Sequence, residues 1–224
     1  WELTSSGSRS TIDVSFNRRI KDADCALCGQ CITHCPVGAL RERDDTGRAF
    51  AALADPDKIT VVQIAPAVRT AWGEAFGLAP EDATVGKLAA ALRRMGFDYV
   101  FDTTFSADLT IMEEGSEFLD RFQKGELEKY PMFTSCCPGW VRFLKSQYPE
   151  LVPALSTSKS PQQMFGAVTK TWFAQKMGID PQKIFCISVM PCLAKKAECD
   201  LPTMRDASYG QDVDLSLTVR EITR

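Results

Sequence analysis

Four cysteines stand close together near the start of the chain, in the order Cys25-x2-Cys28-x2-Cys31-x3-Cys35-Pro36. This spacing lets one loop bring three thiolates to a single [4Fe–4S] cluster, while the fourth cysteine points away and Pro36 turns the chain. Zinc sites and disulfides also use cysteines, but zinc sites usually pair two separate CxxC units. The run therefore predicts iron–sulfur ligation by Cys25, Cys28, Cys31 and Cys35.

Two further cysteine motifs occur in the second half of the chain. One is Thr134-Ser135-Cys136-Cys137-Pro138-Gly139-Trp140, and the other is Met190-Pro191-Cys192-x2-Lys195-x2-Glu198. Two adjacent cysteines cannot easily both face one metal, so we expect one metal ligand and one thiol with another task. On spacing alone, a redox-active cysteine pair or buried core cysteines explain these motifs equally well.

The elements that carry these motifs alternate between strands and helices. Apolar, β-branched runs predict strands at 59–65, 99–105, 132–135, 184–190 and 213–219, and amphipathic helices are expected between them, one of them capped at Thr84 and one running over 109–123. This order predicts an α/β fold with a mostly parallel sheet and helices on both faces. Because parallel strands end at one edge, the cysteine-bearing loops at 136–137 and 191–192 should meet there.

A change of pattern near Asp55-Pro56 predicts two parts. Residues 1–55 are polar, contain the cysteine run and include a short strand at 11–16, as expected for a partial ferredoxin-like α+β iron–sulfur domain. Residues 56–224 form the α/β part, which we expect to be one lobe of a larger domain.

The motifs together resemble one known family. TSCCPGW and MPCLAKKAE, in this order behind a ferredoxin-type cysteine run, look like the first two signature motifs of [FeFe]-hydrogenases. The segments IAPAVR, DTTFSADLTIMEE, SKSPQQMFG and TVREI are similar to the same catalytic domain, so the resemblance extends from Phe16 to Glu221. It implies reversible reduction of protons to H2 at an H-cluster, in which a [4Fe–4S] cubane is joined to a diiron unit with CO, cyanide and a bridging azadithiolate.

The resemblance also implies roles for individual residues. Cys137 and Cys192 match cubane ligands, Cys136 matches the thiol that passes protons to the bridging amine, and Lys195 matches a donor to an iron-bound cyanide. A lysine suits that place because an ammonium group forms a charge-assisted hydrogen bond with an anionic acceptor. Positions that match the lining of the diiron pocket are Ala65, Pro66, Met190 and Gln162.

A proton route is expected on one helix face. Glu114, Glu117 and Arg121 are spaced at i, i+3 and i+7, and the family's relay uses matching residues, with a serine that matches Ser156. Without the family context, an acidic helix face exposed to water would be the better interpretation.

The composition and motifs of the chain limit the classes of binding partner to expect. The net charge of −3 gives no reason to expect nucleic acid or a membrane, and no apolar run is long enough to span one. No GxGxxG or GxxxxGK motif occurs, so binding of NADH would require a partner subunit. The resemblance implies ferredoxin or a similar electron carrier, H2 and protons, and maturation proteins as partners, and nine cysteines fit a reducing, cytoplasmic setting.

The family's third cysteine motif is absent from the chain, and the sequence starts at Trp1. We therefore expect a fragment that does not hold a working H-cluster alone. The alternative is a non-catalytic relative in cluster assembly or sensing, which tends to lose the thiol at the place of Cys136. A plain electron-transfer ferredoxin would explain residues 25–40 and leave the rest unexplained.

Overall fold

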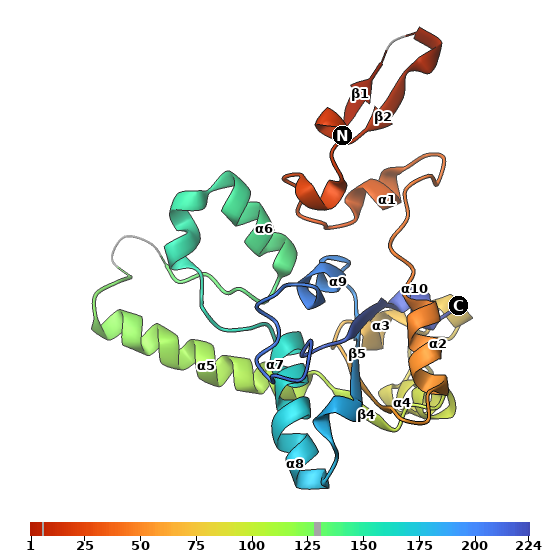
Figure 1. Cartoon of the computed structure of the whole chain (residues 1–224), viewed down its shortest axis with the longest axis vertical. Helices are drawn as coiled ribbons and strands as arrows, with labels where there is room; N and C mark the ends of the chain where they lie inside the picture. The colour runs from red at the N-terminus through yellow and green to blue at the C-terminus, as the bar shows by residue number, and fades with distance from the viewer. Residues whose placement is uncertain (6, 128–130) are drawn as a thin grey trace.

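The computed structural model describes residues 1–5, 7–127 and 131–224, with a four-stranded, fully parallel sheet at its centre. The strands lie in the order β4-β3-β5-β6 (Figure 1). They span Tyr99–Asp102 (β4), Ile59–Ile64 (β3), Ile184–Met190 (β5) and Leu215–Thr218 (β6). The central strands β3 and β5 are rich in Val and Ile, which suits strands covered on both faces.

Helices cover both faces of this sheet, as the sequence predicts. On one face lie α2 (Thr46–Ala54), α3 (Val68–Ala71), α4 (Val85–Arg94) and α10 (Val219–Ile222), and on the other lie α7 (Pro161–Val168) and α8 (Ala174–Met177) (Figure 1). A π-helical turn, Thr169–Phe173, joins α7 to α8. Thr84 caps α4 as expected, because its side chain accepts a hydrogen bond from the Lys87 amide.

Side chains alternate between the two faces of each strand, and one face carries a polar row. Val62 and Ile64 belong to the apolar core under α2 and α4, whereas Val61 belongs to the core under α7. Gln63 is on the α7 side, and the register places it beside Ser188, which in turn lies beside Ser216. Buried polar groups need partners, so this row must be satisfied from the α7 side.

The predicted strand at 132–135 is wrong. This segment makes a single bridge, between Phe133 and Leu155, and does not join the sheet. The ladder does not continue past Ser156 because the next amide on this edge, that of Ser158, donates to the Ser156 hydroxyl instead. The cysteine pair at 136–137 is therefore not at the end of a sheet strand.

Three other predicted bounds shift. The second strand ends at Asp102 rather than 105, because Asp102 Oδ1 accepts hydrogen bonds from the amide and hydroxyl of Thr104 and turns the chain into a helix. That helix, α5, spans Thr104–Gln123 and starts five residues before the predicted Leu109. The last strand begins at Leu215 rather than Val213.

The remaining elements lie around the top of the sheet as drawn in Figure 1. They are α6 (Pro138–Gln147), α9 (Ala194–Cys199), α1 (Gln30–His34) in the cysteine run, and an antiparallel hairpin of β1 (Glu2–Thr4) and β2 (Thr11–Asp13). β2 is shorter than the predicted strand at 11–16. Among the described helices, none is both long and apolar enough to cross a membrane.

Candidate functional site

The ends of the two central strands form the floor of the candidate site. β3 runs into Ala65-Pro66, and β5 ends at Met190 before Pro191-Cys192. The Ala65 amide still donates to the carbonyl of Val189 at 3.0 Å, so the two ends stay side by side. Ala65 and Met190 are buried and Pro66 is exposed. The sheet thus brings together three of the residues expected to line a pocket.

The Cys136-Cys137 motif lies at the N-terminus of a helix rather than at the end of a sheet strand. Cys137 is the N-cap residue of α6, Pro138 occupies the first turn, and the Trp140 amide donates to Cys137 Sγ at 3.5 Å. Cys136 and Cys137 are both exposed. Hydrogen bonds of this kind to sulfur help to set the reduction potential of a thiolate-bound cluster, so this position suits a metal ligand.

Lys195 ties the two cysteine motifs together. Its ammonium Nζ donates to the Cys136 carbonyl at 2.7 Å and to Glu198 Oε2 at 3.0 Å.

The pKa of the Cys192 thiol is raised above its ordinary value. Burial raises it, the Ala194 amide lowers it, and the charge of nearby Cys137 raises it again. Cys137 and Cys192 are therefore close enough for Cys137 to raise the pKa of the Cys192 thiol, although they lie in different cysteine motifs.

Gln162 connects the polar row of the sheet to α9. Its Oε1 accepts from the Ser188 hydroxyl at 2.7 Å, and its Nε2 donates to Glu198 Oε2 at 2.9 Å. Gln63 donates to the Gln162 carbonyl and accepts from Thr103. The Gln162 side chain, expected to line the diiron pocket, is 1% exposed and is held by protein groups on both sides.

Three of the four residues expected on the proton route come together. Glu117 Oε2 accepts from the Ser156 hydroxyl at 2.8 Å, and Glu117 Oε1 accepts from Arg121 at 2.6 Å. Burial raises the pKa of Glu117, but the bonds from Ser156 and Thr157 and the charge of Arg121 outweigh it, so this pKa lies below its ordinary value. Arg121 also donates to the carbonyls of Pro153 and Leu155, which anchors α5 to this loop.

Glu114 lies one helical turn before Glu117 and is not bonded to it. Its Oε1 is buried and has no hydrogen-bond partner among the described residues. A buried carboxylate oxygen without a partner is costly and calls for a water molecule or a mobile proton donor. No hydrogen bond joins Glu114 or the Cys136 thiol to the Glu117–Ser156 pair in the part of the chain that the structure describes.

The run from Cys25 to Cys35 packs against both of the other cysteine motifs, the one at 134–140 and the one at 190–198. Gly29, with φ of +81°, lies so close to Leu193 that a Cβ atom there would overlap the leucine side chain. A Cβ at Gly139 would lie 3.2 Å from the Ala26 carbonyl. Arg142 of α6 donates to the Cys25 carbonyl at 2.8 Å. Groups bound at the run and at the 137/192 site would therefore be near neighbours.

Within the run, Cys35 is the thiol whose pKa is shifted from its ordinary value. Backbone N–H groups of Leu40 and Val37 lower the pKa of Cys35, as suits a thiolate ligand. All nine cysteines are free thiols. Among residues 1–5, 7–127 and 131–224, however, no three His, Cys, Asp or Glu side chains converge on a common point that could hold a metal ion. The ligand roles of these cysteines stay predictions.

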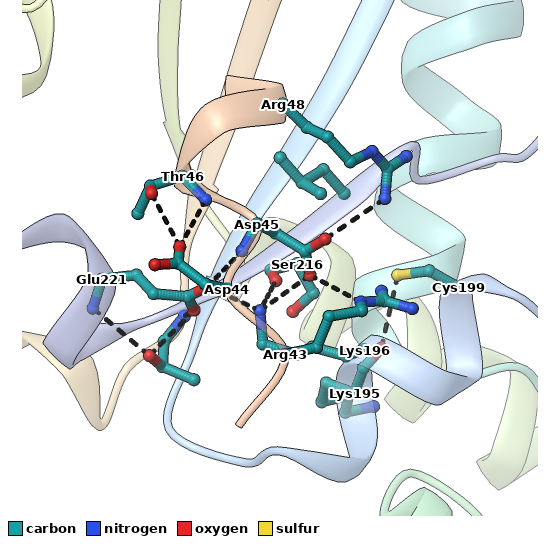
Figure 2. A network of polar contacts seen from close by, with 12 residues as sticks. Arg43, Asp44, Asp45, Thr46, Arg48, Lys195, Lys196, Cys199, Ser216 and Glu221 are labelled. Carbon is teal, nitrogen blue, oxygen red and sulfur yellow. Dashed lines mark hydrogen bonds and ion pairs between the residues drawn. The ribbon is translucent and has the colours of Figure 1, made fainter. Parts of the chain in front are cut away.

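A buried charge cluster on the other side of α9 escaped the sequence analysis. Lys196 Nζ donates to Asp45 Oδ2, to Glu221 Oε1 and to the Ser216 carbonyl, each at 2.9 Å (Figure 2). All three charged side chains are almost fully buried. Burial raises the pKa of Asp45, but Lys196 and Arg43 outweigh it and lower that pKa. The cluster fastens the segment that follows the cysteine run to the helix that follows Cys192.

Comparison with known proteins assigns the family. Residues 58–224 match the model of the iron only hydrogenase large subunit, C-terminal domain, and residues 19–41 match the 4Fe-4S binding domain. The chain belongs to the iron-only hydrogenase large-subunit family. This confirms the resemblance inferred from the cysteine motifs, and the iron–sulfur class with it.

Individual relatives agree with this membership. The NADP-reducing hydrogenase subunit HndD of Solidesulfovibrio fructosivorans is 51% identical over 97% of this chain and 38% of the relative. Iron hydrogenase 1 of Clostridium pasteurianum is 44% identical over 84% of this chain and 32% of the relative. Cytosolic iron-sulfur assembly component 3 of Bos taurus is 34% identical over 89% of this chain and 44% of the relative. The chain thus spans about two fifths of the length of these curated relatives.

A solved structure matches the fold as well. An apo [FeFe]-hydrogenase of Chlamydomonas reinhardtii superposes with a TM-score of 0.74 at 45% identity, covering 81% of this chain and 47% of that chain. The parallel sheet with helices on both faces is therefore the fold of the hydrogenase catalytic domain.

Several residues that shape the site were missed. Ser160, Ser188 and Gln63 are bonded to the Glu198–Gln162 network. Ser188 and Gln63 lie in strands and give no chemical signal until the register is known, and Ser160 is recognisable only as an N-cap residue before Pro161. Glu198 carries a weak signal, because it stands three residues after Lys195 in a predicted helix and such pairs are neighbours.

Proposed function

We propose that this chain is part of an [FeFe]-hydrogenase that catalyses the reversible reduction of protons to H2. The observation that carries the proposal is the position of Lys195, buried between the two cysteine motifs with its ammonium on the Cys136 carbonyl. Family membership and 51% identity to a hydrogenase subunit support it. Since the chain spans only part of these relatives, the activity belongs to a protein that also supplies the missing third motif.

The residues present fit part of an H-cluster. Cys137 and Cys192 offer two soft thiolates, which suit iron–sulfur ligation, and they lie close enough for Cys137 to raise the pKa of Cys192. Ala65, Pro66 and Met190 would line the diiron side, with Gln162 behind them. When bound, the group supplies the redox-active iron and a basic amine at which H2 is formed or split. Residues 1–224 alone offer two cubane ligands, so we expect no working cluster in this chain by itself.

The chain's own residues would move the protons. In our proposal the Cys136 thiol exchanges its proton with the bound group on one side and with Glu114 on the other. The unpartnered Glu114 Oε1 is free to accept such a proton, directly or through water. In one concerted step the Ser156 hydroxyl then receives the proton from Glu114, directly or through water, and passes its own proton to Glu117 Oε2; Arg121 stabilises the Glu117 carboxylate once that proton has left.

Electrons would enter through the cysteine run. Cys25, Cys28, Cys31 and Cys35 would serve [4Fe–4S] ligation, and the contact of Gly29 with Leu193 would set a short path to the Cys192 loop. We propose ferredoxin or a similar carrier as the electron partner. The NADP-reducing relative also supports a nucleotide-linked partner subunit. Nine free cysteines suit a reducing compartment, and we propose the cytoplasm.

The second candidate is a non-catalytic role in cluster assembly, which the similarity to the assembly component of Bos taurus favours. The Cys136 thiol distinguishes the two functions. It is exposed beside the ligand Cys137 and its carbonyl orients Lys195, whereas an assembly protein has no proton to deliver at this place. Cys136 therefore favours the hydrogenase.

The test is H2 evolution by the protein that carries this chain, matured anaerobically and driven by a reduced viologen dye. We expect turnover, and a loss of about 10²-fold or more in Cys136→Ser at unchanged iron content, because a positioned proton donor contributes at least that much. Cys186→Ala, which removes a thiol from the core of β5, is the matched control and should retain turnover. Full turnover in Cys136→Ser, or none in fully loaded wild type, would contradict the proposal.

A further inference from the structure

Glu198 is the meeting point of three donors. It lies in α9 one turn after Lys195 and is 4% exposed. A single oxygen, Oε2, accepts from Ser160 Oγ at 2.9 Å, from Gln162 Nε2 at 2.9 Å and from Lys195 Nζ at 3.0 Å. An exposed helical ion pair needs no such arrangement, so this carboxylate is built into a fixed position.

The donors that hold Glu198 are themselves fixed by the fold. Ser160 is the N-cap residue of α7. Gln162, in the first turn of α7, is held through Oε1 by Ser188 of β5, one of the central strands. Glu198 Oε2 is thus located relative to the sheet by bonds that do not involve Lys195.

The Lys195 side chain has more conformational freedom than Glu198 and needs contacts to hold it in one position. It is long and has many rotamers, and its ammonium has three N–H donors. The Cys136 carbonyl and Glu198 Oε2 take two of these donors. With two bonds in place the direction of the third N–H is determined, and no group among the described residues accepts from it.

We propose that Glu198 is the positioning residue for Lys195: it aims the third ammonium N–H at a small anionic, iron-bound ligand of the cyanide class. Identifying that ligand rests on the proposed function, whereas the positioning itself does not. Glu198 acts only through Lys195. The bond from Lys195 to the Cys136 carbonyl also holds that carbonyl close to α9. By fixing Lys195, Glu198 therefore indirectly sets the distance between the two cysteine loops.

The first test uses the iron-free protein and hydrogen exchange of residues 135–137. Glu198→Gln keeps the shape of the side chain and removes its charge. We expect about tenfold faster exchange in 135–137, since a bond between charged groups is weakened. Glu198→Asp should restore part of the protection. Ser160→Ala removes one donor and no charge, so it tests the same network in a variant that perturbs the fold less.

The matched control is Glu221→Gln. Glu221 is also 4% exposed and also binds a buried lysine of α9, Lys196, at 2.9 Å. Its loss should speed exchange around 43–46 and 218–221 and leave 135–137 unchanged. Equal effects of Glu198→Gln and Glu221→Gln on 135–137, or no effect of Glu198→Gln and Ser160→Ala, would overturn the positioning role.

The second test uses infrared spectra of the anaerobically matured protein. Glu198→Gln should shift or broaden one cyanide band and leave the other in place, because only one cyanide meets Lys195, and Glu221→Gln should leave both unchanged. Unaltered cyanide bands in Glu198→Gln would overturn the assignment of the ligand. A matured wild type without cyanide bands, together with faster exchange in Glu198→Gln, would refute the proposed function and support the positioning role.

Discussion

The two cysteine-bearing regions of this chain are held in very different ways. The run from Cys25 to Cys35 contains a short helix without a buried residue, and it contacts the rest through Gly29, the Ala26 carbonyl and Arg142. Cys192, in contrast, follows directly on buried strand β5, and the helix after it is anchored by Lys195 on one side and Lys196 on the other.

This difference indicates two routes to a metal site. In the 190–199 region the protein supplies the order itself, through a sheet edge and two buried lysines that point in opposite directions. In the run, backbone contacts bring the loop to the right place, but the thiols do not converge within the described residues. We propose that metal binding supplies the remaining order in the run, as in other small sites where binding and folding are coupled.

The strongest way to break the 190–199 region is Lys196→Met. It leaves Asp45 and Glu221 buried without their shared cation, and removing one partner of a buried ion pair costs about 3–5 kcal/mol. We expect a lower urea midpoint for the iron-free chain. Lys124→Met, at an exposed pair with Asp120, is the control and should leave the midpoint unchanged. An unchanged midpoint in Lys196→Met would show that the cluster adds no stability.

Gly29→Ala separates the run from the Cys192 loop. The added Cβ meets Leu193, and φ of +81° adds about 1–2 kcal/mol of backbone strain. Gly38→Ala has the same kind of strain (φ of +62°) and open space around the new Cβ. We expect Gly29→Ala to speed hydrogen exchange at both 25–35 and 191–194, and Gly38→Ala to act on the run alone. Identical exchange profiles for the two variants would exclude the contact.

Arg142→Ala should loosen the same region more mildly. The guanidinium donates to the Cys25 carbonyl at 2.8 Å and more weakly to those of Lys21 and Ala23, and its loss should cost about 1.5 kcal/mol locally. We expect faster proteolysis within 18–24 in the native protein. Lys145→Ala, on the same helix and exposed, should be cut at the wild-type rate. Equal rates for both variants would contradict the anchoring role of Arg142.

The smallest effect is expected from pH, at the α5 side of the site. Because the folded-state pKa of Glu117 is lowered, its contribution to stability is present above the unfolded pKa of about 4.3 and is lost as pH falls through the folded pKa. Wild type should exceed Glu117→Gln in free energy of unfolding by less than about 1 kcal/mol at neutral pH. The two urea curves should converge in acid, and a constant difference across this range would refute the assignment.

Much of the fold was predictable because its signals are local. The β-branched runs at 59–64 and 184–190 predict the two central strands, and the spacing of Cys25 to Cys35 predicts the iron–sulfur run. The segment at 132–135 is also expected to be a strand, but the Ser158 amide that a longer parallel ladder would need donates instead to the Ser156 hydroxyl, which is itself bonded to Glu117. Sequence alone does not show that competition.

The arrangement of charged groups was less predictable, for a related reason. Asp45 and Lys196 stand 151 positions apart, and Ser156 and Glu117 stand 39 apart. Lys195 and Lys196 are adjacent and chemically identical in the sequence, yet successive helical positions point in different directions and meet different carboxylates. The family resemblance singles out Lys195, and the packing of α9 shows the contact that it makes with the Cys136 carbonyl.

The most direct test of the central contrast is hydrogen exchange measured segment by segment on the iron-loaded and the iron-free protein. Our account predicts that loss of iron raises exchange strongly within 25–40, while β5 and the α9 helix keep their protection. Equal loss of protection in both regions, or unchanged hydrogen exchange within 25–40 after iron removal, would contradict it.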